Sequence, residues 1–392
     1  MAGVQSATTA HCSPATKSNP RGSSTGLSQP ATVRTSEVIV ASWAKVELTT
    51  EDGRTVEAQA PVIVSASRST DIPAFYADWF ISRLEKGYAK WFNPFNGVPL
   101  YVSFAKTRLV VFWSKNPRPM LEKIPGRQET PLDIVEQLGR NYYFQFTLND
   151  YEAERIEPNV PPLEARIGTF VELARRIGDS GHGNDRVIWR FDPLLLTDTL
   201  TPRLLLERME RIGDKIAPHT PRLVFSFIDI QAYAKVARNL KRAGISVREF
   251  REEEMLEVAE GVARLVKGWG ISAGTCGEAA DLPGIGHNRC VDDRLMVKCF
   301  PNDEVLMKFI GAQCVEPAFF NQAAVWKAPD RPRKDPGQRA ACGCIMSKDI
   351  GAYNTCPHLC HYCYANSSNN EAMTNWLRHR KNPHAETITG KF

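Results

Sequence analysis

Three cysteines near the C-terminus are spaced in a way that suits an iron–sulfur cluster. Cys356, Cys360 and Cys363 form a CxxxCxxC pattern, and an aromatic residue, Tyr362, directly precedes the last of them. Clusters that only transfer electrons are normally held by four cysteines. A compact loop with three cysteines therefore predicts a [4Fe–4S] cluster in which one iron stays open to a further ligand.

A second set of thiols lies elsewhere in the chain at Cys276, Cys290, Cys342 and Cys344. Four thiols are enough for a second iron–sulfur cluster or for a tetrahedral zinc site. Zinc is also the alternative for the CxxxCxxC loop, with Cys342 or Cys344 as the fourth ligand. The plain interpretation of Cys276 and Cys290 is that they are small buried hydrophobic residues.

The chain alternates short apolar runs with stretches of helical periodicity, which are the elements that must position these cysteines. The strand-like runs are residues 62–67, 87–92, 108–113, 142–148, 186–191, 222–228 and 269–275. The helical patterns cover residues 72–84, 131–139, 161–177, 201–216, 231–243 and 251–267. This alternation predicts an α/β fold, a (β/α) TIM-like barrel that is complete or nearly so. A doubly wound open sheet is the structural alternative, although no glycine-rich fingerprint follows the first strand.

The predicted organisation has four parts. Residues 1–35 are rich in Ser, Thr, Pro, Ala and Gly and are expected to be a disordered tail. Residues 36–60 alternate around an Asp-Gly pair, which predicts a β-hairpin cap. Residues 61–328 form the predicted barrel, and residues 329–392 form the cysteine-rich C-terminal segment.

Polar residues end most of the predicted strands. In a barrel these strand ends converge on one mouth, where active sites are built. The catalytic candidates are Arg68, Asp71, Lys115, Gln145, Arg190, Asp192 and Glu278. The candidates for cofactor binding are Asn116, Ser226 and Tyr362. Closing the ring would return the C-terminal segment beside the first strand, so we expect the cysteine loop to face this mouth.

Four of these candidates have simple structural roles as alternatives. Asp71 precedes Ile-Pro at the start of a helix, so an N-cap is its simplest role. Arg68 is expected either to clamp a carboxylate or phosphate or to pair with Asp71 or Asp192. Arg190 and Asp192 lie on the same side of a strand, which predicts a buried ion pair or a substrate clamp.

Several motifs resemble those of the uncharacterised domain-of-unknown-function 1848 family. They are SRSTDIPAFY (67–76), NPFN (93–96), FWSKNPRP (112–119), YYFQFTL (142–148), VIWRFDP (187–193), ACGC (341–344) and DIGAYNTCPH (349–358) with CYAN (363–366). The resemblance covers about residues 60–392, and that family lends no settled reaction. The cysteine loop itself is similar to that of the radical S-adenosylmethionine superfamily. There the loop usually follows the first strand, whereas here it lies in the last tenth of the chain.

The superfamily resemblance implies a reaction. S-adenosylmethionine would bind the open iron, and an electron from a donor such as flavodoxin or ferredoxin would cleave it. The resulting 5′-deoxyadenosyl radical would abstract hydrogen from an unknown small-molecule or nucleic-acid substrate. A radical enzyme that modifies or repairs nucleic acid is one alternative, because CysTyrAla after the cluster is slightly similar to spore photoproduct lyase. The other is a non-enzymatic binding module stabilised by zinc or a cluster.

Composition limits the remaining classes. The 392 residues are 43% hydrophobic, which is enough to bury a barrel-sized core. No apolar run approaches the ~20 residues that a membrane span requires, and no apolar signal region opens the chain, so we expect a cytoplasmic protein. Ten cysteines in such a chain favour metal binding over disulfides. The net charge of +5 is diffuse and does not argue for an anionic partner.

Overall fold

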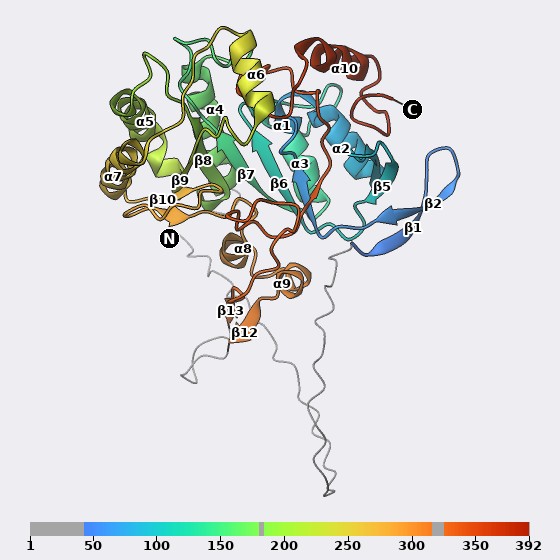
Figure 1. Ribbon diagram of the computed structural model, residues 1–392. Coiled ribbons are helices and arrows are strands. Elements are labelled where there is room, and N and C mark those ends of the chain that lie inside the picture. Colours follow the sequence, from blue (N-terminus) through green and yellow to red (C-terminus); the bar gives the residue numbers. More distant parts are fainter. Residues whose placement is uncertain (1–42, 180–183, 316–324, 392) are drawn as a thin grey trace, which may run out of the picture.

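A parallel β-sheet of eight strands forms the centre of the molecule (Figure 1). The structure, a computed structural model, describes residues 43–179, 184–315 and 325–391, so the predicted tail 1–35 lies outside it. The strand order is β11-β10-β9-β8-β7-β6-β3-β14. In chain order the strands are β3 (Ile63–Ala66), β6 (Leu109–Ser114), β7 (Asn141–Thr147), β8 (Val187–Leu194), β9 (Arg222–Phe227), β10 (Ser272–Thr275), β11 (Gly286–His287) and β14 (Lys348–Asp349).

The α/β class and the parallel sheet are confirmed, but a closed barrel is not shown. Strands β11 and β14 are the two edges, and within the described residues they do not pair with each other. Each has only two residues, so neither offers a long ladder for ring closure. The chain between them contributes α8 (Asp293–Cys299) and α9 (Glu304–Ile310) instead of a further strand–helix unit of the outer layer.

Helices of the outer layer pack against one face of the sheet. They are α1 (Ile72–Phe75), α2 (Ala77–Lys86), α3 (Pro131–Gln137), α4 (Leu163–Ile177), α5 (Pro202–Ile216), α6 (Ala234–Arg242) and α7 (Glu252–Trp269). Strand β7 shows the two-residue alternation, because Tyr142, Phe144 and Phe146 join this core while Tyr143 points to the other face. On that second face Tyr143 packs in a cluster with Leu295 of α8 and the neighbouring helix α9. Both faces of the parallel sheet are thus covered.

The run at 87–92 was predicted to be a strand of the parallel sheet, and this is wrong. Strand β4 (Tyr88–Phe92) pairs antiparallel with β5 (Pro99–Ser103) in a separate sheet of order β1-β2-β5-β4. Six residues join these two strands, whereas a parallel pair needs a crossover of a dozen or more. The predicted hairpin is present in this sheet as β1 (Lys45–Thr49) and β2 (Thr55–Gln59), with Gly53 at φ 81° in its turn.

The C-terminal segment returns beside the first strand of the sheet, as expected, through the short strand β14. Asp349 holds this contact, because its carboxylate accepts hydrogen bonds from the Ser65 hydroxyl at 3.0 Å, the Ser67 hydroxyl at 2.6 Å and the Arg68 amide at 2.7 Å. Gly351 then passes so close that a Cβ there would lie 2.0 Å from the Ser67 Oγ. Helix α10 (Asn369–Lys381) follows, at the opposite end of the molecule from α8 and α9 (Figure 1).

The remaining regular elements are short. They are the antiparallel strands β12 (Gln313–Val315) and β13 (Val325–Lys327) and the 3₁₀ helices Arg118–Leu121, Asn184–Arg186 and Ala217–His219. No helix in the described part of the chain is long and apolar enough to cross a membrane.

Candidate functional site

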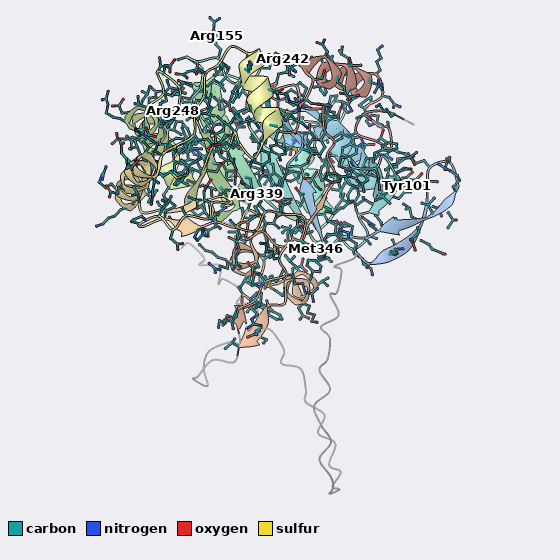
Figure 2. All side chains as sticks on the ribbon, viewed as in Figure 1. Tyr101, Arg155, Arg242, Arg248, Arg339 and Met346 are labelled. Atoms are coloured by element: carbon teal, nitrogen blue, oxygen red, sulfur yellow. The ribbon has the colours of Figure 1, made fainter. Side chains whose placement is uncertain are left out.

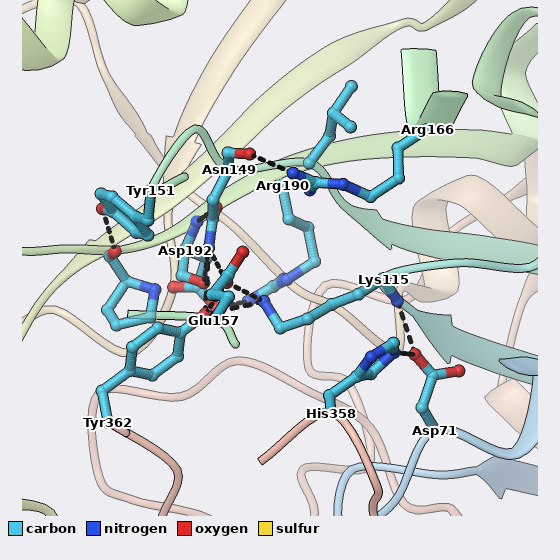
Figure 3. A network of polar contacts seen from close by, with 12 residues as sticks. Asp71, Lys115, Asn149, Tyr151, Glu157, Arg166, Arg190, Asp192, His358 and Tyr362 are labelled. Atoms are coloured by element: carbon cyan, nitrogen blue, oxygen red, sulfur yellow. Dashed lines mark hydrogen bonds and ion pairs between the residues drawn. The ribbon is translucent and has the colours of Figure 1, made fainter. Parts of the chain in front are cut away.

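The cysteine loop, residues 356–363, is attached by hydrogen bonds to segments at the carboxyl ends of β3, β6 and β7 (Figure 3). The imidazole Nε2 of His358 lies 2.9 Å from the Asp71 carboxylate, in the turn after β3. The Asn159 amide, in the segment after β7, donates to the Pro357 carbonyl at 2.9 Å. The sequence separates this loop from β3 by almost 300 residues, so only the tertiary fold brings them together.

Asp71 connects the loop to two other elements. Its carboxylate accepts from the Ala74 amide at 3.0 Å, which confirms the predicted N-cap of α1. It also accepts from the Ser114 hydroxyl and the Lys115 amide, both at 2.7 Å, and lies next to His358. Asp71 is therefore a shared anchor for α1, the end of β6 and the cysteine loop, which goes beyond the capping role.

A second anchor is the buried network around Glu157 (Figure 3). The Glu157 carboxylate accepts from the Lys115 ammonium at 2.8 Å, the Asn149 amide at 2.9 Å and the Tyr362 hydroxyl. Lys115 also donates to the Tyr362 hydroxyl at 2.7 Å. Tyr362, the aromatic residue of the cysteine motif, is thereby held at the ends of β6 and β7 by three polar side chains.

Charge pairing dominates the ionisation of this network. Burial by itself would raise the pKa of Glu157, but the charges of Lys115 and Arg166 and the hydrogen bonds lower this pKa to about 2. Burial would lower the pKa of Lys115, but the negative charge of Glu157 and its hydrogen bond raise it. Both partners are therefore ionised at neutral pH, and Lys115 places a positive charge near the cysteine loop.

The three loop cysteines are thiols with few exposed atoms and with backbone amides directed at two of them. Cys360 is buried, and Cys356 and Cys363 are half-buried. The Ala365 amide donates to the Cys363 sulfur at 3.3 Å, and the backbone amides of His358 and Asp71 lie near Cys356. Burial raises the pKa of all three thiols, and these amides oppose that increase at Cys356 and Cys363.

This donor set fits an iron–sulfur cluster. Three thiols on one loop, amide hydrogen bonds to their sulfurs and a nearby ammonium group are the features that stabilise and tune such clusters. Within the described residues, no three or more His, Cys, Asp or Glu side chains enclose a position for a metal ion. In a cubane each cysteine binds its own iron, so its ligands do not converge on one ion.

The predicted pair of Arg190 and Asp192 is present at the end of β8. The guanidinium and carboxylate are 2.6 Å apart, and Ser226 from β9 donates to the same carboxylate. Burial would raise the pKa of Asp192, but Arg190 and the Ser226 hydrogen bond lower it. Arg190 also donates to the Gln145 amide oxygen at 3.3 Å. Asn149 joins this pair to the Glu157 network by accepting from the Asp192 amide at 2.8 Å.

Arg68 does not form the predicted ion pair with Asp71 or Asp192 among the residues described here. Its guanidinium lies 5.0 Å from the centre of the Trp113 ring and donates to the Ser347 hydroxyl at 3.4 Å. Arg190 lies 5.3 Å from the same ring. The ordered turn that Asp349 holds after β3 directs the Arg68 side chain toward Trp113 instead of toward either predicted partner.

Glu278 and Asn116 are less closely connected to the other candidates. The half-buried Glu278 accepts from the Phe227 amide at 3.3 Å. Burial raises its pKa, and the charge of Arg339, which is labelled in Figure 2, opposes this increase. Asn116 is half-buried beside Lys115, and its amide donates to the Ser114 hydroxyl. The structure thus brings Lys115, Asp192 and their partners into one network, with Glu278 at its margin.

Sequence reasoning missed Glu157 and Asp349 as site residues. Glu157 lies in the irregular segment between β7 and α4, where polar residues are common and periodicity gives no signal. Asp349 lies within a quoted motif, but nothing in its local sequence identifies a carboxylate that holds the turn after β3. The four cysteines 276, 290, 342 and 344 do come together, and their geometry is described below.

Comparisons with known proteins add one assignment. The model of a family described as a domain of unknown function, DUF1848, matches residues 63–365. No curated protein matched the chain. Among solved structures, the crystal structure of a "putative alpha-L-fucosidase" from Bacteroides thetaiotaomicron is 13% identical and covers 72% of this chain and 88% of its own. Its TM-score is 0.25, and it carries no argument about fold or function.

Proposed function

We propose that this chain, which belongs to the DUF1848 family, is an iron–sulfur enzyme of the radical S-adenosylmethionine type. The observation that carries the proposal is the position of the CxxxCxxC loop. It is anchored at the carboxyl ends of a parallel sheet, beside a buried polar network, by two of its own side chains, His358 and Tyr362. In α/β proteins this end of the sheet is where ligands bind.

In this proposal Cys356, Cys360 and Cys363 hold three irons of a [4Fe–4S] cluster. When bound, such a cluster with an open iron supplies the electron that cleaves S-adenosylmethionine to a 5′-deoxyadenosyl radical. Lys115 offsets the negative charge that the thiolates bring into a buried place. The amides at Cys356 and Cys363 favour the thiolate forms that binding requires.

Asp192 is our choice for the residue that contacts the substrate. Its side chain is 21% exposed, whereas that of its partner Arg190 is 4% exposed and contacts Asp192, Gln145 and the Cys290 sulfur. Arg190 is therefore a positioning residue that holds the carboxylate in its ionised form. An ionised carboxylate at the carboxyl ends of the strands would accept hydrogen bonds from the hydroxyl or amino groups of a polar substrate. Asp192 lies at the end of a parallel strand, which is where (β/α) barrels, including the nearly complete barrel that the sequence predicts, carry their active sites.

The remaining parts of the proposal concern the cellular setting. Cleavage requires an electron donor such as flavodoxin or ferredoxin, and the cluster is sensitive to oxidation. The need for this donor and the need to protect the cluster from oxidation both favour the cytoplasm.

Anaerobic purification followed by metal analysis tests the proposal. We expect the protein to contain iron and acid-labile sulfide, and we expect the single variants Cys356→Ala, Cys360→Ala and Cys363→Ala to lose them. Cys299→Ala is the matched control, because Cys299 is a half-buried thiol in α8 outside the loop.

The second measurement concerns S-adenosylmethionine. We expect it to change the electron paramagnetic resonance spectrum of the reduced protein and to yield 5′-deoxyadenosine slowly without substrate. Full iron content in all three loop variants would show that the ligand assignment is wrong. Iron without a spectral change and without cleavage would support a non-enzymatic, cluster-stabilised binding module instead.

A further inference from the structure

Four cysteines outside the proposed cluster loop meet in one buried place. Cys276 follows β10, Cys290 precedes α8, and Cys342 and Cys344 lie before β14. The sulfurs of Cys276 and Cys290 are 3.3 Å apart. The Cys344 side chain lies near both the Cys290 and the Cys342 side chains. Three segments that are separate in sequence thus contribute to one group of four thiols.

The surroundings of this group of thiols suit negative charge on sulfur. The Cys344 sulfur accepts from the amides of Cys290 at 3.3 Å and Val291 at 3.4 Å. The Arg190 guanidinium lies 2.8 Å from the Cys290 sulfur. Arg68 has a buried guanidinium nitrogen, Nη2, that finds no partner among the described residues. A buried guanidinium nitrogen without a hydrogen-bond acceptor is costly, and a thiolate near Arg68 would lower that cost.

Distances distinguish three uses of such thiols. A disulfide requires sulfurs about 2.05 Å apart. Tetrahedral bonds of about 2.3 Å to a single ion place sulfurs about 3.8 Å apart. The cysteine sulfurs around a cubane lie roughly 6–7 Å apart. The observed 3.3 Å between Cys276 and Cys290 is closest to the value for a single ion.

The geometry points to a mononuclear tetrathiolate site for a soft divalent ion, Zn²⁺, with Cys276, Cys290, Cys342 and Cys344 as its ligands. As the side chains stand, the four sulfurs do not enclose the ion position, so binding turns the thiols inward. Four protons leave as Zn²⁺ enters, and the resulting site carries two negative charges. Arg68 carries a positive charge near these thiolates, and Arg190 lies next to Cys290 while it stays paired with Asp192.

Such a site would be structural. It would tie residues 342–344 to the loops that hold Cys276 and Cys290, immediately before the chain enters β14 and the cysteine loop. The inference does not depend on the proposed function, because it uses none of the three cysteines at 356, 360 and 363.

Metal analysis with Zn²⁺ as the probe tests this site. We expect about one tightly held zinc per chain in the full-length protein, as a closed tetrathiolate site requires. Cys290→Ser and Cys344→Ser should lose it. Cys356→Ser should keep the zinc while losing iron, which separates this site from the cluster loop. Cys299→Ser is the matched control and should keep both metals.

A measurement on the unaltered protein covers the case in which these variants do not fold. Titration with an organomercurial should release zinc as four thiolates react, and Co²⁺ in place of zinc should show thiolate charge-transfer bands. The inference is overturned if the unaltered protein holds no zinc. It is also overturned if the zinc persists in Cys344→Ser, or if Cys344→Ser loses acid-labile sulfide and thus reveals a second cluster.

Discussion

Removing one charge from the Lys115–Glu157 pair is expected to destabilise the protein strongly. The ammonium and carboxylate are 2.8 Å apart, and their side chains are 16% and 4% exposed. The environment lowers the pKa of Glu157 from 4.5 to about 2, which corresponds to about 3 kcal/mol in favour of the ionised form. Leaving one member of a buried pair without its partner typically costs about 3–5 kcal/mol. We therefore expect Lys115→Met to lower the free energy of unfolding by about 3 kcal/mol.

A double-mutant cycle measures the interaction directly. Lys115→Met and Glu157→Gln are each expected to be costly, because each leaves a buried charge alone. The double variant removes both charges, so its loss should be smaller than the sum of the single losses by about 1–3 kcal/mol. Urea unfolding followed by circular dichroism under anaerobic conditions gives the four free energies.

An exposed pair provides the control for this cycle. Arg203 and Glu207 on α5 are 2.7 Å apart, but their side chains are 81% and 49% exposed. Replacing Arg203 by Met should change the free energy of unfolding by less than about 0.5 kcal/mol. Strictly additive losses at Lys115 and Glu157, or losses as small as at Arg203, would refute the view that a desolvated charge pair holds the cysteine loop.

Three further predictions concern the same framework. The pKa of Glu157 is lower in the folded than in the unfolded chain, so its stabilising contribution is complete above pH 4.5 and is lost as pH falls toward about 2. Unfolding of the parent chain and of Glu157→Gln, measured at several pH values, should therefore show that their difference in stability shrinks between pH 4.5 and about 2. Gly351→Ala should lower the thermal midpoint of unfolding and cost about 1–3 kcal/mol, because its Cβ would overlap the Ser67 hydroxyl in the turn after β3. Gly168→Ala is the control, since this glycine lies on the exposed face of α4, and it should stabilise the protein by about 0.5–1 kcal/mol. Asp71→Ala should destabilise the protein clearly more than the ~1 kcal/mol expected for Ser368→Ala. Both residues cap helices, but the Asp71 carboxylate also contacts Ser114, the Lys115 amide and His358. Equal losses of stability in urea unfolding would contradict this prediction.

Local chemistry explains most of what could be predicted from the sequence. The short apolar run at residues 142–148 predicted a strand of the parallel sheet, and β7 (Asn141–Thr147) lies there. Asp71 before Ile-Pro predicted an N-cap, and the spacing of Arg190 and Asp192 placed both on one side of a strand. Each of these features depends on residues within a few positions of one another, so the sequence contains the necessary information.

Partnership between distant segments could not be predicted in this way. Residues 87–92 have the composition of a strand, but composition does not say which sheet a strand joins. Strand β4 pairs with the nearby β5 instead of with the parallel sheet. Glu157 became part of the site because the fold brings Lys115 and Tyr362 to it from segments 42 and 205 residues away. A polar residue in an irregular segment carries no sign of such partners.

The sequence by itself determined the cysteine spacing, the helices and most of the parallel strands, because spacing, capping and periodicity are local properties. Only the tertiary structure decided that the sheet is not closed by the strands of the described residues. It also decided that the C-terminal cysteine loop is held by Asp71 and Glu157, and that four further thiols meet beside Arg190. The physical reason is that burial and charge pairing act between whatever surfaces the folded chain brings into contact. Those contacts depend on the packing of the complete chain and not on any single segment.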